Sequence, residues 1–225
     1  MLLDTLQNDT ANYIHLVSLL RTPHEIIVNT EDSLLVYFSE QDTYIAESTA
    51  ADITPFLRTI DSCHVNRLES TNEAIYDHFR GKRKTSYKCY QYGPVSADKE
   101  DPHLQLLKQK DLDAAIATHG EETYLRQLWE RRRLYGYYVE GALVGYIAYH
   151  IDGSFGAVYV FPAYRRQGYA GKMISAVAYV CNDALMYSQV LVDNDASIRL
   201  HESMQLPCSG KIIHWTYDEG FCYKD

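Results

Sequence analysis

The sequence predicts an α/β protein in which a mixed β-sheet is flanked by helices, and three observations predict this fold class. First, short runs rich in β-branched and aromatic residues alternate with stretches whose apolar residues recur at helical spacing. Second, residues 93–102 combine Gly-Pro, Asp-Pro and several charged residues, which indicates a boundary between two halves. Third, a glycine-rich loop at residues 165–171 lies between a predicted strand and a predicted helix.

The first half mixes helices and strands. Its opening helix is predicted because Tyr13, Ile14 and Val17 share one helical face, and Pro23 follows its end. Ser70 or Thr71 is expected to cap a later helix. In order, the predicted elements are a helix over 6–20, strands over 25–29, 34–38 and 43–46, a helix over 52–60, a strand over 65–68, a helix that ends at Gly81, and a strand over 86–92.

The second half repeats the mixture with a different order. Asp111 is expected to cap one helix, and Gly120 to end it. In order, the predicted elements are a strand over 103–108, helices over 111–119 and 121–133, strands over 137–139, 142–150 and 158–161, the helix after the loop, a strand over 188–192, a helix over 195–204, a strand over 211–217 and an edge strand over 221–223. We therefore expect an N-terminal α/β half at 1–93, a linker at 94–102 and a C-terminal domain at 103–225.

The loop at 165–171 has the composition of a phosphate cradle. Pro162 ends the strand before it, because proline has no N–H for the ladder. Gly168 and Gly171 let a ligand approach the backbone, and a helix N-terminus offers unpaired N–H groups and partial positive charge. Arg165 and Arg166 add two permanent charges. The alternative is a tight corner with two solvated arginines; the spacing of a P-loop and of a dinucleotide fingerprint is absent.

The six residues Arg165-Arg166-Gln167-Gly168-Tyr169-Ala170 resemble the Gln/Arg-x-x-Gly-x-Gly/Ala signature of the GCN5-related N-acetyltransferase (GNAT) superfamily. Residues 192–206 resemble a second segment of that family, with Asn194 in place and His201 where the family has a tyrosine. The order of strands before the loop resembles the family's antiparallel meander. The resemblance covers residues 104–217, and the first half is similar to a degenerate GNAT half without a cofactor loop.

The resemblance implies the GNAT fold, with its fourth and fifth strands splayed, and acetyl-CoA as cofactor. Backbone amides of the loop would hold the pyrophosphate, and free N–H groups of the fourth strand would meet the pantetheine and the thioester. Asn194 would bond the pantetheine, cap its own helix, or do both. The implied cofactor-binding residues are Val158, Tyr159, Val160, Arg165, Arg166, Gln167, Gly168, Tyr169, Ala170, Gly171 and Asn194.

The implied activity is acetyl transfer to an amine of a small molecule or peptide, by direct attack in a ternary complex. His201 would protonate the departing thiolate, unless it is a surface histidine. Relatives often place a glutamate on the fourth strand, and Tyr159 stands at that position; His150, Asp152, Glu122 or a chain of waters are further candidates for the base. We take His201, Tyr159 and His150 as the predicted catalytic residues. The alternative is a non-catalytic acyl-CoA-binding module.

The composition and charge of the chain exclude several classes of protein. The chain has 225 residues and a net charge of −9, which disfavours nonspecific binding to nucleic acid. It has no apolar run near the ~20 residues that cross a bilayer, and the Met1 end does not read as a secretory signal. Its five cysteines are scattered without a Cys-x-x-Cys pair, so we expect free thiols and no metal. We expect a cytoplasmic protein, with a homodimer as one option for its assembly.

Overall fold

The computed structural model describes residues 1–79, 82–92 and 100–218. These residues form two compact units. The first unit comprises the described residues within 1–90, 189–195 and 208–218; the second comprises those within 91–188 and 196–207. The expected linker at 94–102 lies largely outside the described residues, as do the expected edge strand at 221–223 and the helix terminator Gly81.

The first unit is built on a mixed sheet. The pairs β1–β2, β2–β3, β4–β11 and β11–β5 are antiparallel, whereas β3 and β4 are parallel, with Tyr44 paired to Leu68 and Ile45 to Glu69. In spatial order the strands are β1 His24–Asn29, β2 Ser33–Phe38, β3 Thr43–Ser48, β4 Arg67–Ser70, β11 Cys208–Tyr217, β5 Arg83–Tyr92 and, at the edge, β10 Met186–Leu191.

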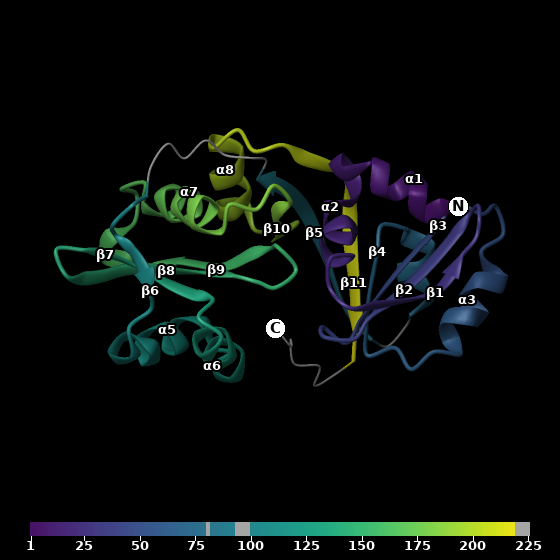
Figure 1. Cartoon of the computed structure of the whole chain (residues 1–225), viewed down its shortest axis with the longest axis horizontal. Coiled ribbons are helices and arrows are strands. Elements are labelled where there is room, and N and C mark those ends of the chain that lie inside the picture. The colour runs from purple at the N-terminus through teal and green to yellow at the C-terminus, as the bar shows by residue number, and fades with distance from the viewer. Residues whose placement is uncertain (80–81, 93–99, 219–225) are drawn as a thin grey trace. The chain divides into compact units, whose positions relative to one another are not determined.

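Helices cover both faces of this sheet (Figure 1). They are α1 Leu2–Asn8 and α2 Thr10–Leu19 on one face, and α3 Thr54–Asp61 and α4 Glu73–His78 on the other. The single helix expected over 6–20 is wrong, because the backbone leaves the helical conformation at Asp9. The cap of α4 is Asn72 rather than Ser70 or Thr71, since the Asn72 side chain accepts from two backbone N–H groups of the helix.

The second unit contains the antiparallel meander that the sequence predicts. Its four-stranded sheet follows the order β6 Leu104–Leu106, β7 Leu134–Val139, β8 Ala142–Tyr149 and β9 Phe155–Val160. Helices α5 Leu112–His119 and α6 Glu122–Glu130 pack on one face, and α7 Tyr169–Cys181 packs on the other (Figure 1). The helix α8 Asp195–Ser203 packs beside α7 through Leu200. Gly120 ends α5 as expected, with a positive φ of 88°, whereas the Asp111 side chain accepts from the Tyr138 hydroxyl instead of capping the helix.

The two units do not follow the order of the chain. The strand β11, expected in a C-terminal domain at 103–225, pairs with both β4 and β5 and belongs to the first unit. The physical reason is that β4 and β5 would otherwise each present an unpaired edge, and β11 satisfies both at once. Its buried Ile213 and Thr216 show that it is an interior strand. Cys63, Cys89, Cys181 and Cys208 are free thiols, as expected.

Candidate functional site

The strands β9 and β10 begin side by side and then part. A parallel bridge joins Ser154 to Tyr187, and the Tyr187 N–H donates to the Gly153 carbonyl at 3.3 Å. Beyond this bridge β9 continues in the four-stranded sheet with β8, whereas β10 joins the other sheet. This parting of the two strands is the splayed strand pair that the resemblance implies.

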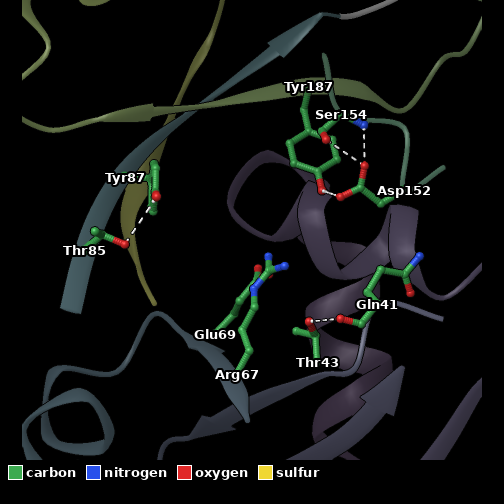
Figure 2. A network of polar contacts seen from close by, with 9 residues as sticks. All are labelled: Gln41, Thr43, Arg67, Glu69, Thr85, Tyr87, Asp152, Ser154 and Tyr187. Carbon is green, nitrogen blue, oxygen red and sulfur yellow. Dashed lines mark hydrogen bonds and ion pairs between the residues drawn. The ribbon is translucent and has the colours of Figure 1, made fainter. Parts of the chain in front are cut away.

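A buried carboxylate fixes the point where the strands part. Asp152 accepts from the Ser154 N–H at 2.8 Å and the Ser154 hydroxyl at 2.6 Å, and its other oxygen accepts from the Tyr187 hydroxyl at 3.1 Å (Figure 2). These bonds tie the turn after β8 to the start of β10. Asp152, weighed as a base in the sequence, therefore has a structural role in this conformation.

A β-bulge lies in the middle of β9. Gly156 pairs with Ala148 and Tyr159 pairs with Tyr146, so two residues of β9 oppose one residue of β8. Ala157 takes a positive φ of 48°, a strained conformation for a residue with a side chain. β-Bulges are common next to functional sites, where they change the direction in which the side chains of a strand point.

The bulge also sorts the side chains of β9 between two faces. Val158 and Val160 pack with the cluster around α7, whereas Ala157, Tyr159 and Phe161 pack with the cluster around α5 and α6. The Phe161 N–H donates to the Val144 carbonyl of β8 at 3.0 Å. Because backbone groups alternate along a strand, the N–H of Val160 points away from β8, toward the side where β10 departs.

The glycine-rich loop leads from β9 to the N-terminus of α7. Arg166 and Gly168 have positive φ values of 62° and 79°. No described side chain caps α7, whose N-cap residue is Gly168. The first intrahelical bond runs from the Lys172 N–H to the Gly168 carbonyl at 3.2 Å, so the N–H groups of the three preceding residues have no intrahelical acceptor. The buried Met173, Ile174, Ala176 and Val177 anchor the helix.

The two arginines of the loop differ in their contacts. The Arg165 Nε donates to the Val160 carbonyl at 3.0 Å, and its guanidinium lies 5.5 Å from the centre of the Tyr159 ring. Arg166 and Gln167 are exposed. A Cβ added at Gly168 would meet no atom within 4 Å. Uncapped helix donors, two cations and open space at Gly168 fit the pyrophosphate of CoA.

His201 is buried, with 2% of its surface exposed. Its Nδ1 donates to the Ser197 carbonyl at 2.7 Å, and its Nε2 accepts from the Ser188 hydroxyl at 2.8 Å. The ring stacks on Phe155 with centroids 5.9 Å apart. Burial lowers the pKa of His201, although the Ser197 bond opposes this. The neutral ring in this tautomer has its one N–H engaged, so this conformation leaves none for a thiolate.

The other predicted catalytic residues lie on the face of the sheet that α5 and α6 cover. Tyr159 stacks on Tyr146 with centroids 5.4 Å apart. His150, directly after β8, lies with its Nε2 3.0 Å from the Tyr124 hydroxyl. Glu122 is exposed and pairs with Arg126 at 2.8 Å. Tyr124 lies within the helix expected over 121–133, and neither its contact with His150 nor the bulge had a signal in the local pattern.

Asn194 belongs to the first unit, where it is exposed just before α8. Its N–H donates to the Leu191 carbonyl at 3.0 Å. Its contact with a cofactor therefore stays a prediction. Among the described residues no group of three or more His, Cys, Asp or Glu side chains could hold a metal ion. Within the same residues, no helix is both long and apolar enough for a membrane span.

Comparison with known proteins agrees with this geometry. Residues 104–205 match the model of the acetyltransferase (GNAT) family. Of the solved structures, a Drosophila protein superposes with a TM-score of 0.65 at 12% identity, over 91% of this chain and 88% of that one. A GNAT-family acetyltransferase from Colwellia psychrerythraea gives 0.54 at 15% identity, over 91% and 89%. A GCN5-related N-acetyltransferase-like protein from Streptococcus suis gives 0.54 at 15%, over 96% of both chains.

No curated protein sequence matches the chain. Residues 104–205, which carry the meander, the loop and α7, define a domain of the acetyltransferase class. Residues 104–205 thus form a domain similar to the GNAT family, and the described part of the chain has the mixed α/β fold of solved structures from that family.

Proposed function

We propose that this protein is an acetyl-CoA-dependent N-acetyltransferase that moves an acetyl group to an amine of a small molecule or peptide. The observation that carries the proposal is the uncapped N-terminus of α7, placed at the end of the bulged strand β9 and reached through Arg165, Arg166 and Gly168. This arrangement suits a pyrophosphate whose attached thioester extends along β9.

The cofactor would be held mainly by backbone. The N–H groups of Gln167 to Gly171 and the two arginines take the pyrophosphate. The outward N–H of Val160 takes a pantetheine carbonyl, and Val158 and Tyr159 lie at the thioester end. Backbone donors fixed in a strand cost no reorganisation when charge develops on the thioester oxygen.

Transfer needs a neutral amine, although an alkyl amine has a pKa near ~10. Bound acetyl-CoA supplies an activated acetyl group; the chain supplies the geometry and a route for the proton. The N–C bond forms as the C–S bond breaks, and the thiolate takes a proton from the attacking nitrogen. His201 takes no part in this route, because its one ring N–H donates to the Ser197 carbonyl.

A thiol-release assay with acetyl-CoA and a panel of small amines and peptides tests the proposal. We expect thiol release that depends on one class of amine and a mass increase of one acetyl group on that amine. A panel without turnover, in a protein that binds CoA by calorimetry, overturns the enzymatic proposal.

The second candidate is a non-catalytic acyl-CoA-binding module. The specific observation that favours it is His201, which replaces the family's tyrosine and is buried with both ring nitrogens engaged. Calorimetry with CoA together with the amine panel separates the two candidates, because both require CoA binding and only the enzyme releases thiol. The cysteines that the structure describes are free thiols, which suits a reducing compartment such as the cytoplasm for either candidate.

A further inference from the structure

Three side chains of the second unit form an array that the cofactor site does not use. They are His119 at the end of α5, Tyr124 in the first turn of α6 and His150 directly after β8. The Tyr124 hydroxyl lies 3.0 Å from the His150 Nε2, and the two rings stack at 5.8 Å with an angle of 20°. The His119 ring lies 5.3 Å from the Tyr124 ring. His150 is 5% exposed, so this is a built contact and not a surface encounter.

The array lies against β9 next to the bulge. A Cβ added at Gly156 would lie 3.1 Å from the His150 Nε2. Gly156 precedes Val158 by two residues, with the bulge at Ala157 between them. An amine nitrogen needs about 3 Å to a proton acceptor and about 3–3.5 Å to the carbon that it attacks. A group that accepts the proton must therefore lie close to the thioester, and this array lies against the strand along which the proposed function extends it.

We propose that Tyr124 and His150 act as a pair that takes the proton from the acceptor ammonium, with His119 as a positioning residue. This inference rests on the proposed function. The ammonium gives its proton to the Tyr124 oxygen, while the Tyr124 hydroxyl proton passes to the His150 Nε2. The amine is left neutral, Tyr124 is unchanged, and His150 becomes an imidazolium that returns the proton to solvent.

The charges around the array suit a single transferable proton. Burial lowers the pKa of His119; the nearby Glu121 opposes this, and the proximity of His150 lowers that pKa further. His119 therefore stays neutral near pH 7 and adds no second positive charge. Of the other acids nearby, Glu122 pairs with Arg126, and Asp152 is engaged by Ser154 and Tyr187. The His119 Nδ1 is buried and has no hydrogen-bond partner among the described residues.

The test is a pH profile of acetyl transfer by the whole chain. We expect Tyr124→Phe to lower kcat on the order of 100-fold near pH 7 and to leave the KM for acetyl-CoA unchanged. The deficit should shrink as the pH approaches the pKa of the amine, because the free amine then needs no base. His150→Gln should behave in the same way, and the double variant should be no worse than either single one, since the pair works as one unit.

The matched control is Tyr138→Phe. The Tyr138 hydroxyl also makes two hydrogen bonds, to Asp111 and from the Lys108 N–H, at the start of α5 and not at β9. We expect it to keep the wild-type profile. A Tyr124→Phe variant that matches this control, or that loses the same factor at every pH, overturns the proton-accepting pair and leaves the proposed function standing. A wild-type protein that acetylates no amine overturns the proposed function, and the pair with it.

Discussion

The N-termini of α4 and α7 occupy comparable places in the two units, each following a strand of a mixed α/β fold. At α4 the protein satisfies the helix itself: the Asn72 side chain accepts from the Ala74 N–H at 2.9 Å and the Ile75 N–H at 3.3 Å. At α7 the N-cap residue is Gly168, which has no side chain to offer. The first helix end is closed, and the second is left open for an acceptor from outside.

In the first unit a carboxylate also bonds Thr71, the residue directly before the helix cap Asn72. Glu47 accepts from the Thr71 N–H at 2.6 Å and the Thr71 hydroxyl at 2.7 Å, at the point where β3 and β4 end. β3 and β4 stay paired there, whereas β9 and β10 part. The first unit therefore satisfies the donors of its strand-to-helix turn with its own side chains, whereas the turn before α7 has no side-chain cap.

The largest expected effect is at Gly168, where the comparison can be broken. Gly168→Glu places a negative charge at the helix end that the phosphates need, and forces a side chain into a φ of 79°. We expect CoA affinity measured by calorimetry to fall at least ~100-fold, since about 3 kcal/mol corresponds to that factor.

Gly141→Glu is the control for backbone strain. Gly141 has a φ of 83° and, like Gly168, no atom within 4 Å of an added Cβ, but it lies in the hairpin between β7 and β8. We expect both variants to lose a similar amount of stability and only Gly168→Glu to lose CoA. Equal affinities in the two variants would show that the loop does not hold the cofactor.

The second prediction concerns Glu47, the buried carboxylate that accepts two hydrogen bonds from Thr71 in the first unit. Burial raises the pKa of Glu47 to about 7, although the bonds from Thr71 and the charge of Lys211 lower it. The ordinary pKa is 4.5, so between these values the folded protein binds more protons than the unfolded chain. The free energy of unfolding therefore falls as the pH rises through this window, and it changes no further on this account above it.

Glu47→Gln removes that dependence while keeping an acceptor for Thr71. We expect the free energy of unfolding of the variant, measured relative to the wild type, to be about 2 kcal/mol higher at pH 8 than at pH 5. Urea titrations at the two pH values measure the difference. The exposed Glu31→Gln is the control, with no expected change. A constant offset at both pH values would mean that Glu47 does not titrate in this range.

The third prediction tests the cap of α4. The Asn72 amide also donates to the Ser48 carbonyl at 2.8 Å, so the residue joins the helix to the end of β3. Asn72→Ala should cost about 1–2 kcal/mol of stability and leave CoA affinity unchanged, since α4 binds no ligand in this proposal. Asn72→Asp keeps the acceptor and should recover most of the loss. A drop in CoA affinity with Asn72→Ala would contradict the division of roles.

The second unit could be predicted from the sequence because its signals are local. Strand alternation gave the meander, and the run from Arg165 to Gly171 has a helix N-terminus built into its order. The pairing of β11 with β4 and β5 could not be predicted, because it joins segments more than a hundred residues apart and no local pattern encodes the partner.

Contacts between distant segments also limited what the sequence could predict about the candidate site. His201, on α8, matched a motif position. Its burial, however, depends on Phe155 of β9 and Ser188 of β10. The bulge at Ala157 depends on the register between β8 and β9, which alternation in one strand does not fix. The backbone conformation of the loop was therefore easier to predict than the side-chain contacts around it.

The smallest expected effect comes from Gly156, which lies where the open site of the second unit meets the Tyr124–His150 pair. A methyl group there lies 3.1 Å from the His150 Nε2, so the ring must move by a few tenths of an ångström and its bond to Tyr124 weakens. We expect Gly156→Ala to lower kcat by roughly five- to tenfold, about 1 kcal/mol in the barrier, with CoA affinity unchanged. In a Tyr124→Phe background the pair is already broken, so the same methyl should have no further effect. An undiminished effect in that background would place its origin in the backbone of β9 and not in the proton-accepting pair.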